Sequence, residues 1–116
     1  MALKTKYDLV YDDSIAASST DIRTSPIVPD GRVVRVLNFG GYDPRSGDGI
    51  SSFITLQFGS GSDWQTIRAG GDGFFDIKWE KGKDFTGDGI KRFRLIRQNK
   101  STSAKIIVAW FIALIV

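Results

Sequence analysis

The chain has 116 residues, with 16 basic and 13 acidic side chains and a formal charge of +3, so it fits one domain that can bury its own core. It contains neither cysteine nor histidine. These absences exclude a disulfide framework, most zinc and copper sites and the nucleophile pairs that need Cys or His, and they argue against an enzyme. The near-balanced charge does not by itself indicate nucleic-acid binding.

The first 31 residues are predicted to form an N-terminal arm. Residues 6–12 alternate in polarity, which indicates a short strand or extended segment. Residues 13–29 are rich in Ser, Thr and Ala and include Pro26 and Pro29, which disfavour a helix or a central strand. We expect this arm to dock on a neighbouring subunit or partner protein through its aliphatic side chains, Ile15, Ile22, Ile27 and Val28.

The first ten residues lack the apolar stretch that a signal peptide needs, so we expect synthesis in the cytoplasm.

Residues 32–116 are predicted to form the folded domain. Strands are expected at residues 32–39, 50–58, 64–69, 74–80 and 91–98, separated by glycine-bearing turns and loops at residues 40–49 and 81–89. In the first strand, Val33, Leu37 and Phe39 should share one face, with Val34 and Val36 on the other. No stretch has a helical period. The pattern predicts an all-β fold, an antiparallel β-sandwich, jelly roll or small barrel.

The last eleven residues, Ile106 to Val116, contain no polar side chain. As a helix they would rise only about 16 Å, roughly half of a membrane's hydrocarbon thickness. As a strand they are apolar on both faces. We expect the even-numbered face, Trp110 included, to belong to the core. The odd-numbered face is predicted to be a subunit interface, in a trimer that packs its terminal strands about the symmetry axis: Ile107, Ala109, Phe111, Ala113 and Ile115.

Gly-Asp-Gly occurs three times, at residues 47–49, 71–73 and 87–89, each time before a large apolar residue. Glycine accepts positive φ and Asp hydrogen-bonds nearby N–H groups, so the triplet predicts a tight turn into a strand. The functional alternative is a calcium site. Its candidate ligands are Asp43, Asp48, Asp84 and Asp88. Neither the loop that holds Asp43 and Asp48 nor the loop that holds Asp84 and Asp88 has EF-hand spacing, so we expect no metal and no other cofactor.

The densest basic cluster lies in residues 91–100. Arg92 and Arg94 should share one strand face and are candidate contacts for an anionic partner, whereas Phe93 and Leu95 should face the core with Arg97 on their side. A solvated face is the simpler interpretation of the charges. Trp64, Trp79 and Trp110 with Tyr42 could form a sugar-stacking platform, but each tryptophan lies on a periodic strand, which favours packing in a core or interface. No catalytic residues are predicted.

The order of these parts, an N-terminal arm, strands broken by Gly-Asp-Gly loops and the closing run WEKGKDFTGDGIKRFRLIRQNKSTSAKIIVAWFIALIV, resembles the small jelly-roll or sandwich proteins of tailed-phage virions. The resemblance implies a non-enzymatic structural protein of the virion, often trimeric, such as a capsid decoration protein or a tail-associated module. Its partners would be further copies of itself and a capsid or tail protein, with no membrane, nucleic acid or small molecule. The alternatives are a single-stranded nucleic-acid-binding barrel and a carbohydrate- or calcium-binding sandwich.

Overall fold

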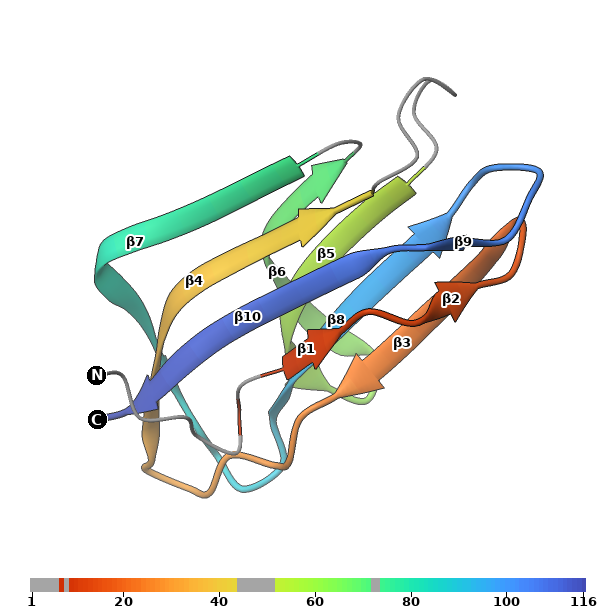
Figure 1. Cartoon of the computed structure of the whole chain (residues 1–116). Coiled ribbons are helices and arrows are strands. Elements are labelled where there is room, and N and C mark those ends of the chain that lie inside the picture. The colour runs from red at the N-terminus through yellow and green to blue at the C-terminus, as the bar shows by residue number, and fades with distance from the viewer. Residues whose placement is uncertain (1–6, 8, 44–51, 72–73) are drawn as a thin grey trace.

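The computed structural model describes residues 7, 9–43, 52–71 and 74–116 (Figure 1). These residues form ten strands and no helix, and every paired strand is antiparallel. The predicted all-β, sandwich-like fold is confirmed. None of the described segments is a helix long and apolar enough to cross a membrane.

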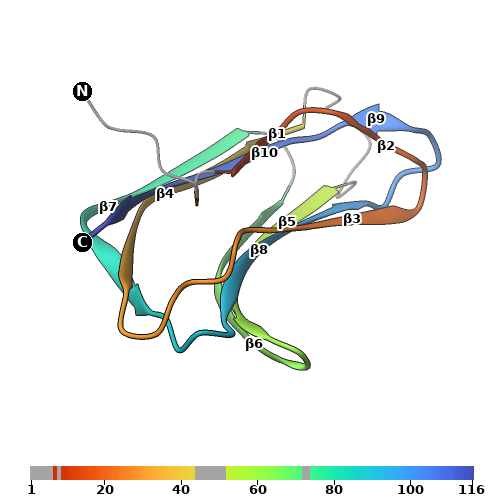
Figure 2. The same cartoon turned by 90° about the horizontal axis from the view of Figure 1, so that it is seen from below.

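Two four-stranded sheets pack face to face. The first, here the β10 sheet, has the order β1 (Leu9–Tyr11), β10 (Val108–Ile115), β4 (Val33–Tyr42) and β7 (Phe74–Thr86). The second, the β8 sheet, has the order β3 (Ser19–Thr24), β8 (Arg92–Asn99), β5 (Ser52–Ser60) and β6 (Asp63–Gly71). A ribbon of β2 (Ser14–Ile15) and β9 (Lys105–Ile106) joins them at one end. Figure 2 shows the sheets as two layers.

The core lies between the layers, where alternate side chains of each strand point inward. Ile54, Leu56 and Phe58 of β5 are buried, in keeping with the alternation of side chains along a strand. On β8, Phe93 and Leu95 are fully buried. The ring of Phe93 lies 4.7 Å from that of Phe58 and 5.2 Å from that of Phe111, so it links both sheets.

The predicted faces of β4 are correct from Val33 to Leu37 but wrong for Phe39, because the strand contains a bulge. Val34, Val36 and Phe39 are all buried, although their numbers differ in parity. In the pairing with β10, Val36 and Asn38 lie opposite the consecutive residues Ala113 and Ile112, so β4 has one residue more than its partner at this point. One extra residue in a strand reverses the alternation beyond it, so Phe39 joins the two valines on the core face. The predicted loops beside these strands are also shorter than expected, since β4 runs to Tyr42 and β7 to Thr86.

Residues 9–24, within the predicted arm, form strands of the sandwich itself, which is at odds with a separate arm that ends after residue 31. Strands β1, β2 and β3 of this segment pair with β10, β9 and β8. Ile15 and Val28 are buried in the chain's own core, whereas Ile22 and Ile27 are 54% and 39% exposed. Without this segment β10 and β8 would be open sheet edges, which invite unwanted pairing. The Ser- and Thr-rich sequence of β3 is typical of the solvated edge strand that it forms.

The two faces of β10 are the reverse of the prediction. Ile107, Ala109, Phe111 and Ala113 are fully buried in the domain core, so they are not available as a subunit interface, and only Ile115 of that set is exposed. The even-numbered side chains lie on the outer surface of the β10 sheet and are half-buried. Both faces are apolar, so alternation alone could not orient the strand. The alanines allow close approach of the two layers around Phe111.

A buried guanidinium ties several strands together. Arg97 of β8 is 1% exposed and points inward, as its shared face with Phe93 and Leu95 predicted. Its Nη2 donates to Asp13 Oδ1 at 2.6 Å and to Asp21 Oδ2 at 2.7 Å. Its Nη1 donates to the carbonyl of Ile107 at 2.7 Å. The same side chain therefore holds β8, β3, the β1–β2 connection and the entry to β10. A second buried ion pair joins Lys105 to Asp43.

We expect Arg97→Met to lower the free energy of unfolding by about 2–4 kcal/mol, because the Ile107 carbonyl loses its donor and Asp13 and Asp21 lose their buried cation, keeping only the more exposed Arg23. Urea denaturation measures the loss. Arg94→Met, on the same strand but facing outward, is the matched control and should cost less than about 1 kcal/mol. Equal losses in the two variants would contradict the assigned role of Arg97.

Stability should also depend on the ionisation of Asp13. The hydrogen bond from Arg97 lowers the pKa of Asp13 from 3.8 to about 2. Because the folded-state pKa is depressed, the unfolded chain takes up the proton first, and this stabilisation is lost as the pH falls from about 4 to about 2. Asp13→Asn should therefore flatten the dependence of the urea midpoint on pH in that window. Parallel profiles for the variant and the parent protein would refute the prediction.

Candidate binding surfaces

The outer surface of the β10 sheet carries a set of apolar side chains, here called the apolar face. They come from four strands and are placed by the register, which sets Val10 opposite Trp110 and Tyr42 opposite both Val108 and Phe74. The apolar face comprises Val10, Tyr42, Phe74, Val108, Trp110, Ile112 and Leu114. Phe74 is 67% exposed and Val10 55%. Monomeric proteins seldom leave a contiguous surface of this kind uncovered.

Trp110 is held rigidly within the apolar face. Its indole lies over the backbone of Gly40, and its Nε1 donates to Asn38 Oδ1 at 2.8 Å. The amide of Asn38 donates in turn to the carbonyl of Ile77 at 2.9 Å and to Asp76. Arg35 and Asp84 form a paired border along the same sheet, with contacts of 2.7 and 3.0 Å. An apolar centre bordered by polar groups is the usual composition of a protein interface, and the polar groups here already have hydrogen-bond partners.

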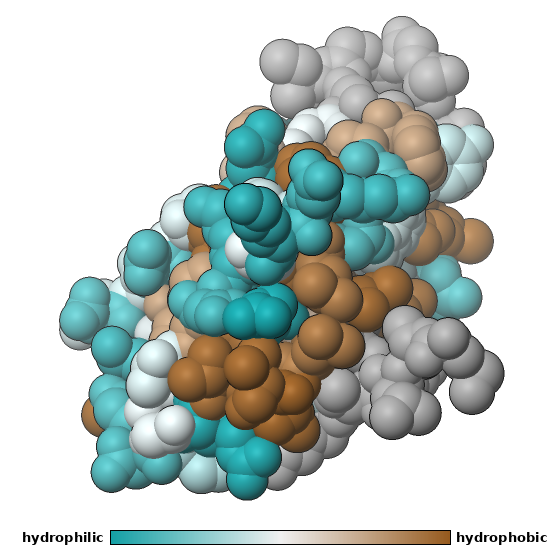
Figure 3. Space-filling view, turned by 90° about the vertical axis from the view of Figure 1, so that its left-hand side faces the viewer, coloured by the Kyte–Doolittle hydropathy of each residue, from teal (hydrophilic) through white to brown (hydrophobic). Residues whose placement is uncertain are grey.

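The end of the molecule that carries the C-terminus is also partly apolar. Ile115 and Val116 are 41% and 59% exposed. Figure 3 shows this side of the molecule, where apolar side chains gather between hydrophilic ones. Exposed apolar surface is therefore found beyond the apolar face as well.

The outer surface of the β8 sheet is cationic. The guanidinium of Arg94 stacks on the ring of Trp64 at 4.1 Å, and its Nε donates to Gln57 Oε1 at 2.6 Å. Gln57 donates to Thr66 Oγ1 at 3.0 Å. Arg92 lies on the same face two residues earlier, as the sequence predicted, and Lys100 lies over the ring of Phe53 at 5.2 Å. We call this surface the cationic face: Phe53, Gln57, Trp64, Thr66, Arg92, Arg94 and Lys100.

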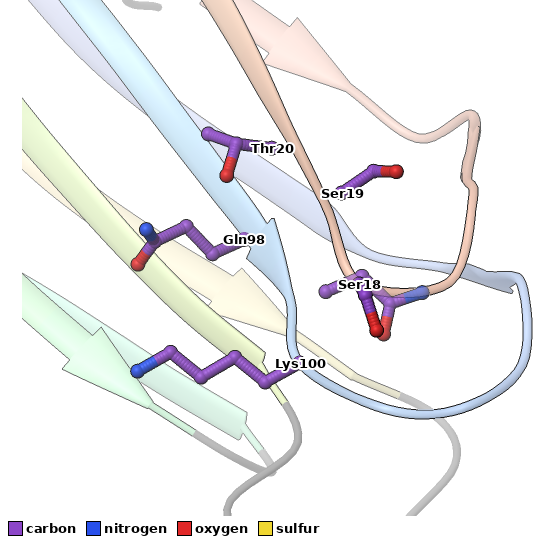
Figure 4. A pocket seen from close by; sticks show the side chains of 6 residues that line it. Ser18, Ser19, Thr20, Gln98 and Lys100 are labelled. Carbon is purple, nitrogen blue, oxygen red and sulfur yellow. The ribbon is translucent and has the colours of Figure 1, made fainter.

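A shallow polar pocket of about 360 Å³ lies where the cationic face meets the edge strand β3. It is lined by Ser18, Ser19, Thr20, Gln98, Asn99 and Lys100. In Figure 4 the side chains of Thr20, Gln98 and Lys100 project in the same direction from adjacent strands, and that of Ser19 points away from them. Ser18 has a φ of 54° and its N–H donates to the carbonyl of Ser101 at 3.1 Å, which fixes the pocket rim.

Sequence reasoning did not identify this pocket. Its two sides are more than 70 residues apart and meet only because β3 pairs with β8, with Thr20 opposite Gln98. The only local signal was the basic cluster that ends at Lys100.

The acidic side chains considered for calcium have other partners. Asp43 is paired with Lys105, and Asp84 accepts two hydrogen bonds from Arg35. Asp88 Oδ1 accepts the N–H groups of Ile90 and Lys91 at 3.0 and 2.9 Å, as expected for a Gly-Asp-Gly turn. Asp48 lies outside the described residues. Within the described segments no three His, Cys, Asp or Glu side chains are grouped to hold a metal ion.

The three tryptophans do not form one platform. Trp64 lies on the outer surface of the β8 sheet, whereas Trp110 lies on the outer surface of the β10 sheet. Trp79 packs against the core. Tyr42 contacts Phe74 on the apolar face, with ring centroids 6.3 Å apart. Their positions agree with packing rather than with a joint sugar-binding platform.

Comparisons with known proteins support the fold. No family model and no curated protein matches the chain. Among solved structures, it is similar to the Yersinia pseudotuberculosis-derived mitogen, with a TM-score of 0.57, 10% identity and coverage of 95% of this chain and 86% of the mitogen. PirA gives a TM-score of 0.46 at 15% identity, covering 94% of this chain and 96% of PirA. Dimeric latent PorU from Porphyromonas gingivalis gives 0.42 at 10% identity, covering 96% of this chain and 12% of PorU. At such identities the likeness to the mitogen concerns the fold alone.

We expect Gly40→Ala to disturb the apolar face. The added Cβ would press on the Trp110 ring and lie 2.7 Å from the carbonyl oxygen of Phe75, so the strand or the indole must move. The cost should be about 1–3 kcal/mol of unfolding free energy, with a shift in tryptophan emission. Gly71→Ala is the control, because its Cβ would meet only the Ser52 carbonyl oxygen at 3.6 Å. An unchanged emission spectrum and unfolding midpoint for Gly40→Ala would contradict the assigned packing.

Proposed function

We propose that this protein is a non-enzymatic structural protein that assembles as a homo-oligomer through its apolar face. The observation that carries the proposal is the contiguous apolar surface around Trp110, in which Phe74, Val10 and Tyr42 are 67%, 55% and 43% exposed. Fully burying one large apolar side chain on association contributes roughly 1.5–3 kcal/mol to the binding free energy. Several such side chains on each copy can offset the entropic cost of association.

Pairing about a two-fold axis is the simplest arrangement for this face. Antiparallel sheets pack face to face in sandwiches, and an isologous contact uses the same patch on both copies. The trimer expected from sequence relied on the odd-numbered face of β10, which is in the core. A trimer would now have to use the even-numbered face, and the oligomeric mass distinguishes it from a dimer.

We further propose a role in a virion, as a capsid decoration or tail-associated protein that binds a capsid or tail protein. The support is the resemblance of the sequence to small phage sandwich proteins, together with the sandwich fold and its exposed apolar face. The exposed Ile22 and Ile27 remain candidates for a contact with such a partner. Ile15 and Val28 do not, because they are buried in the domain core.

The assembly proposal predicts that a charge in the apolar face dissociates the oligomer. Ile112→Lys places an ammonium group beside Trp110, where burial on association would be costly. We expect the parent protein to sediment as an oligomer at about 10 µM and the variant as a monomer, since the parent should bind in the micromolar range or tighter.

Ile96→Lys is the matched control, since Ile96 is a half-buried isoleucine on the outer surface of the other sheet. It should leave the mass unchanged, and far-UV circular dichroism should show both variants folded. A parent protein that is monomeric at this concentration, or a control that dissociates as readily as Ile112→Lys, would overturn the proposal.

A further inference from the structure

We propose that the cationic face and the adjoining pocket bind an anionic polysaccharide, a sugar chain that carries sulfate or carboxylate groups. This surface belongs to the β8 sheet, on the side of the sandwich opposite the apolar face. Oligomerisation through the apolar face would therefore leave it accessible. Several copies presented on one oligomer would also bind a polymer with avidity.

The charges of the cationic face are not neutralised within the described residues. The inward or border cations Arg97, Arg35 and Lys105 are each paired with carboxylates. Arg92, Arg94 and Lys100 have no ion pair in the part of the chain that the structure describes. None of the outward positions on β3, β5 and β8 that the register defines holds an acidic residue. The surface thus has a local positive potential that a net charge of +3 does not reveal.

Arg94 is preorganised to bind an anion. Stacking on Trp64 and the hydrogen bond from its Nε to Gln57 fix the plane of the guanidinium. Both Nη groups have no hydrogen-bond partner among the described residues, so they can donate together to one sulfate or carboxylate. Arg92 lies on the same face two residues earlier, so the two Cα atoms are about 6–7 Å apart along the strand. Two guanidinium groups carried at this backbone spacing can contact successive anionic groups on a chain.

The pocket supplies the complementary contacts for sugar hydroxyls. Thr20 and Gln98 present a hydroxyl and an amide side by side, and Lys100 adds a charge (Figure 4). Gln98 lies four residues from Arg94, about 13 Å along β8. Between them Ile96 and the 54% exposed Ile22 form an apolar floor, which is suited to the apolar face of a sugar ring. The surface therefore matches several linked sugars rather than one.

Single-stranded nucleic acid fits this face less well. Binding of that kind relies on bases that stack on open aromatic rings. Both aromatic rings here already have a cation over them, Arg94 at 4.1 Å from the Trp64 centroid and Lys100 at 5.2 Å from the Phe53 centroid. The amide and hydroxyl groups of Gln57, Thr66, Thr20 and Gln98 are suited to pairing with sugar hydroxyls.

The test is titration of the full chain with heparin oligosaccharides in about 100 mM salt, where exposed charges more than about 10 Å apart are screened. The double variant Arg92→Gln, Arg94→Gln should weaken binding at least about tenfold, because two charge-assisted contacts are lost. Lys78→Gln, Lys81→Gln on β7 is the matched control with the same change in net charge, and it should change the Kd less than about twofold. Gln98→Ala should weaken binding of an octasaccharide but not of a disaccharide that occupies only the arginine pair.

Four results would each overturn the proposal. They are no heparin binding by the parent protein, equal weakening by the two double variants, equal binding of uncharged dextran, and binding of oligo(dT) as tight as that of a heparin chain of equal charge. The last result would assign the face to nucleic acid. Oligomeric mass is measured separately, so failure of this proposal is distinguishable from failure of the assembly proposal.

Discussion

The contacts of Arg97 impose the constraint on which the sandwich depends. A guanidinium at 1% exposure must have partners, and those partners are Asp13, Asp21 and the Ile107 carbonyl. They lie on segments from both ends of the chain. Satisfying one buried charge therefore brings the N-terminal strands, β8 and the start of β10 together. It also holds Ile107 at the point where the chain enters β10, so that Ile107 and the residues of the same parity face the core.

This orientation determines the character of both outer surfaces. With Phe111 and the two alanines inside, Trp110, Ile112 and Leu114 must lie on the outside of the β10 sheet. On β8 the inward position of Arg97 places Arg92 and Arg94 outside. One sheet thus presents an apolar surface and the other a cationic one. A sandwich with two such different faces can associate through one and bind a ligand on the other, and this division underlies both proposals.

Much of the fold was predictable from local pattern. The strands around residues 52–60, 74–80 and 92–99 were recognised because their inner and outer side chains differ in polarity, and Asp88 caps its turn as expected. The same reasoning put Arg92 and Arg94 on one face opposite Phe93. It failed for Phe39 of β4, because a bulge before it reverses the alternation, and for the N-terminal segment, whose Ser- and Thr-rich edge strand has little apolar periodicity. The pocket could not be anticipated, because β3 and β8 are far apart in the chain.

By itself, the sequence determined the all-β class and most of the strands. It also shows that the chain has no thiol or imidazole group, which many catalytic and metal sites use. Those properties follow from composition and from side-chain alternation, which are local. Only the tertiary structure decided which side of β10 is buried, since both sides of Ile106 to Val116 are apolar and alternation cannot choose between them. The choice was made by contacts over long sequence distances: the Arg97 cluster, the close approach that Ala109 and Ala113 allow, and the pairing of β1 with β10.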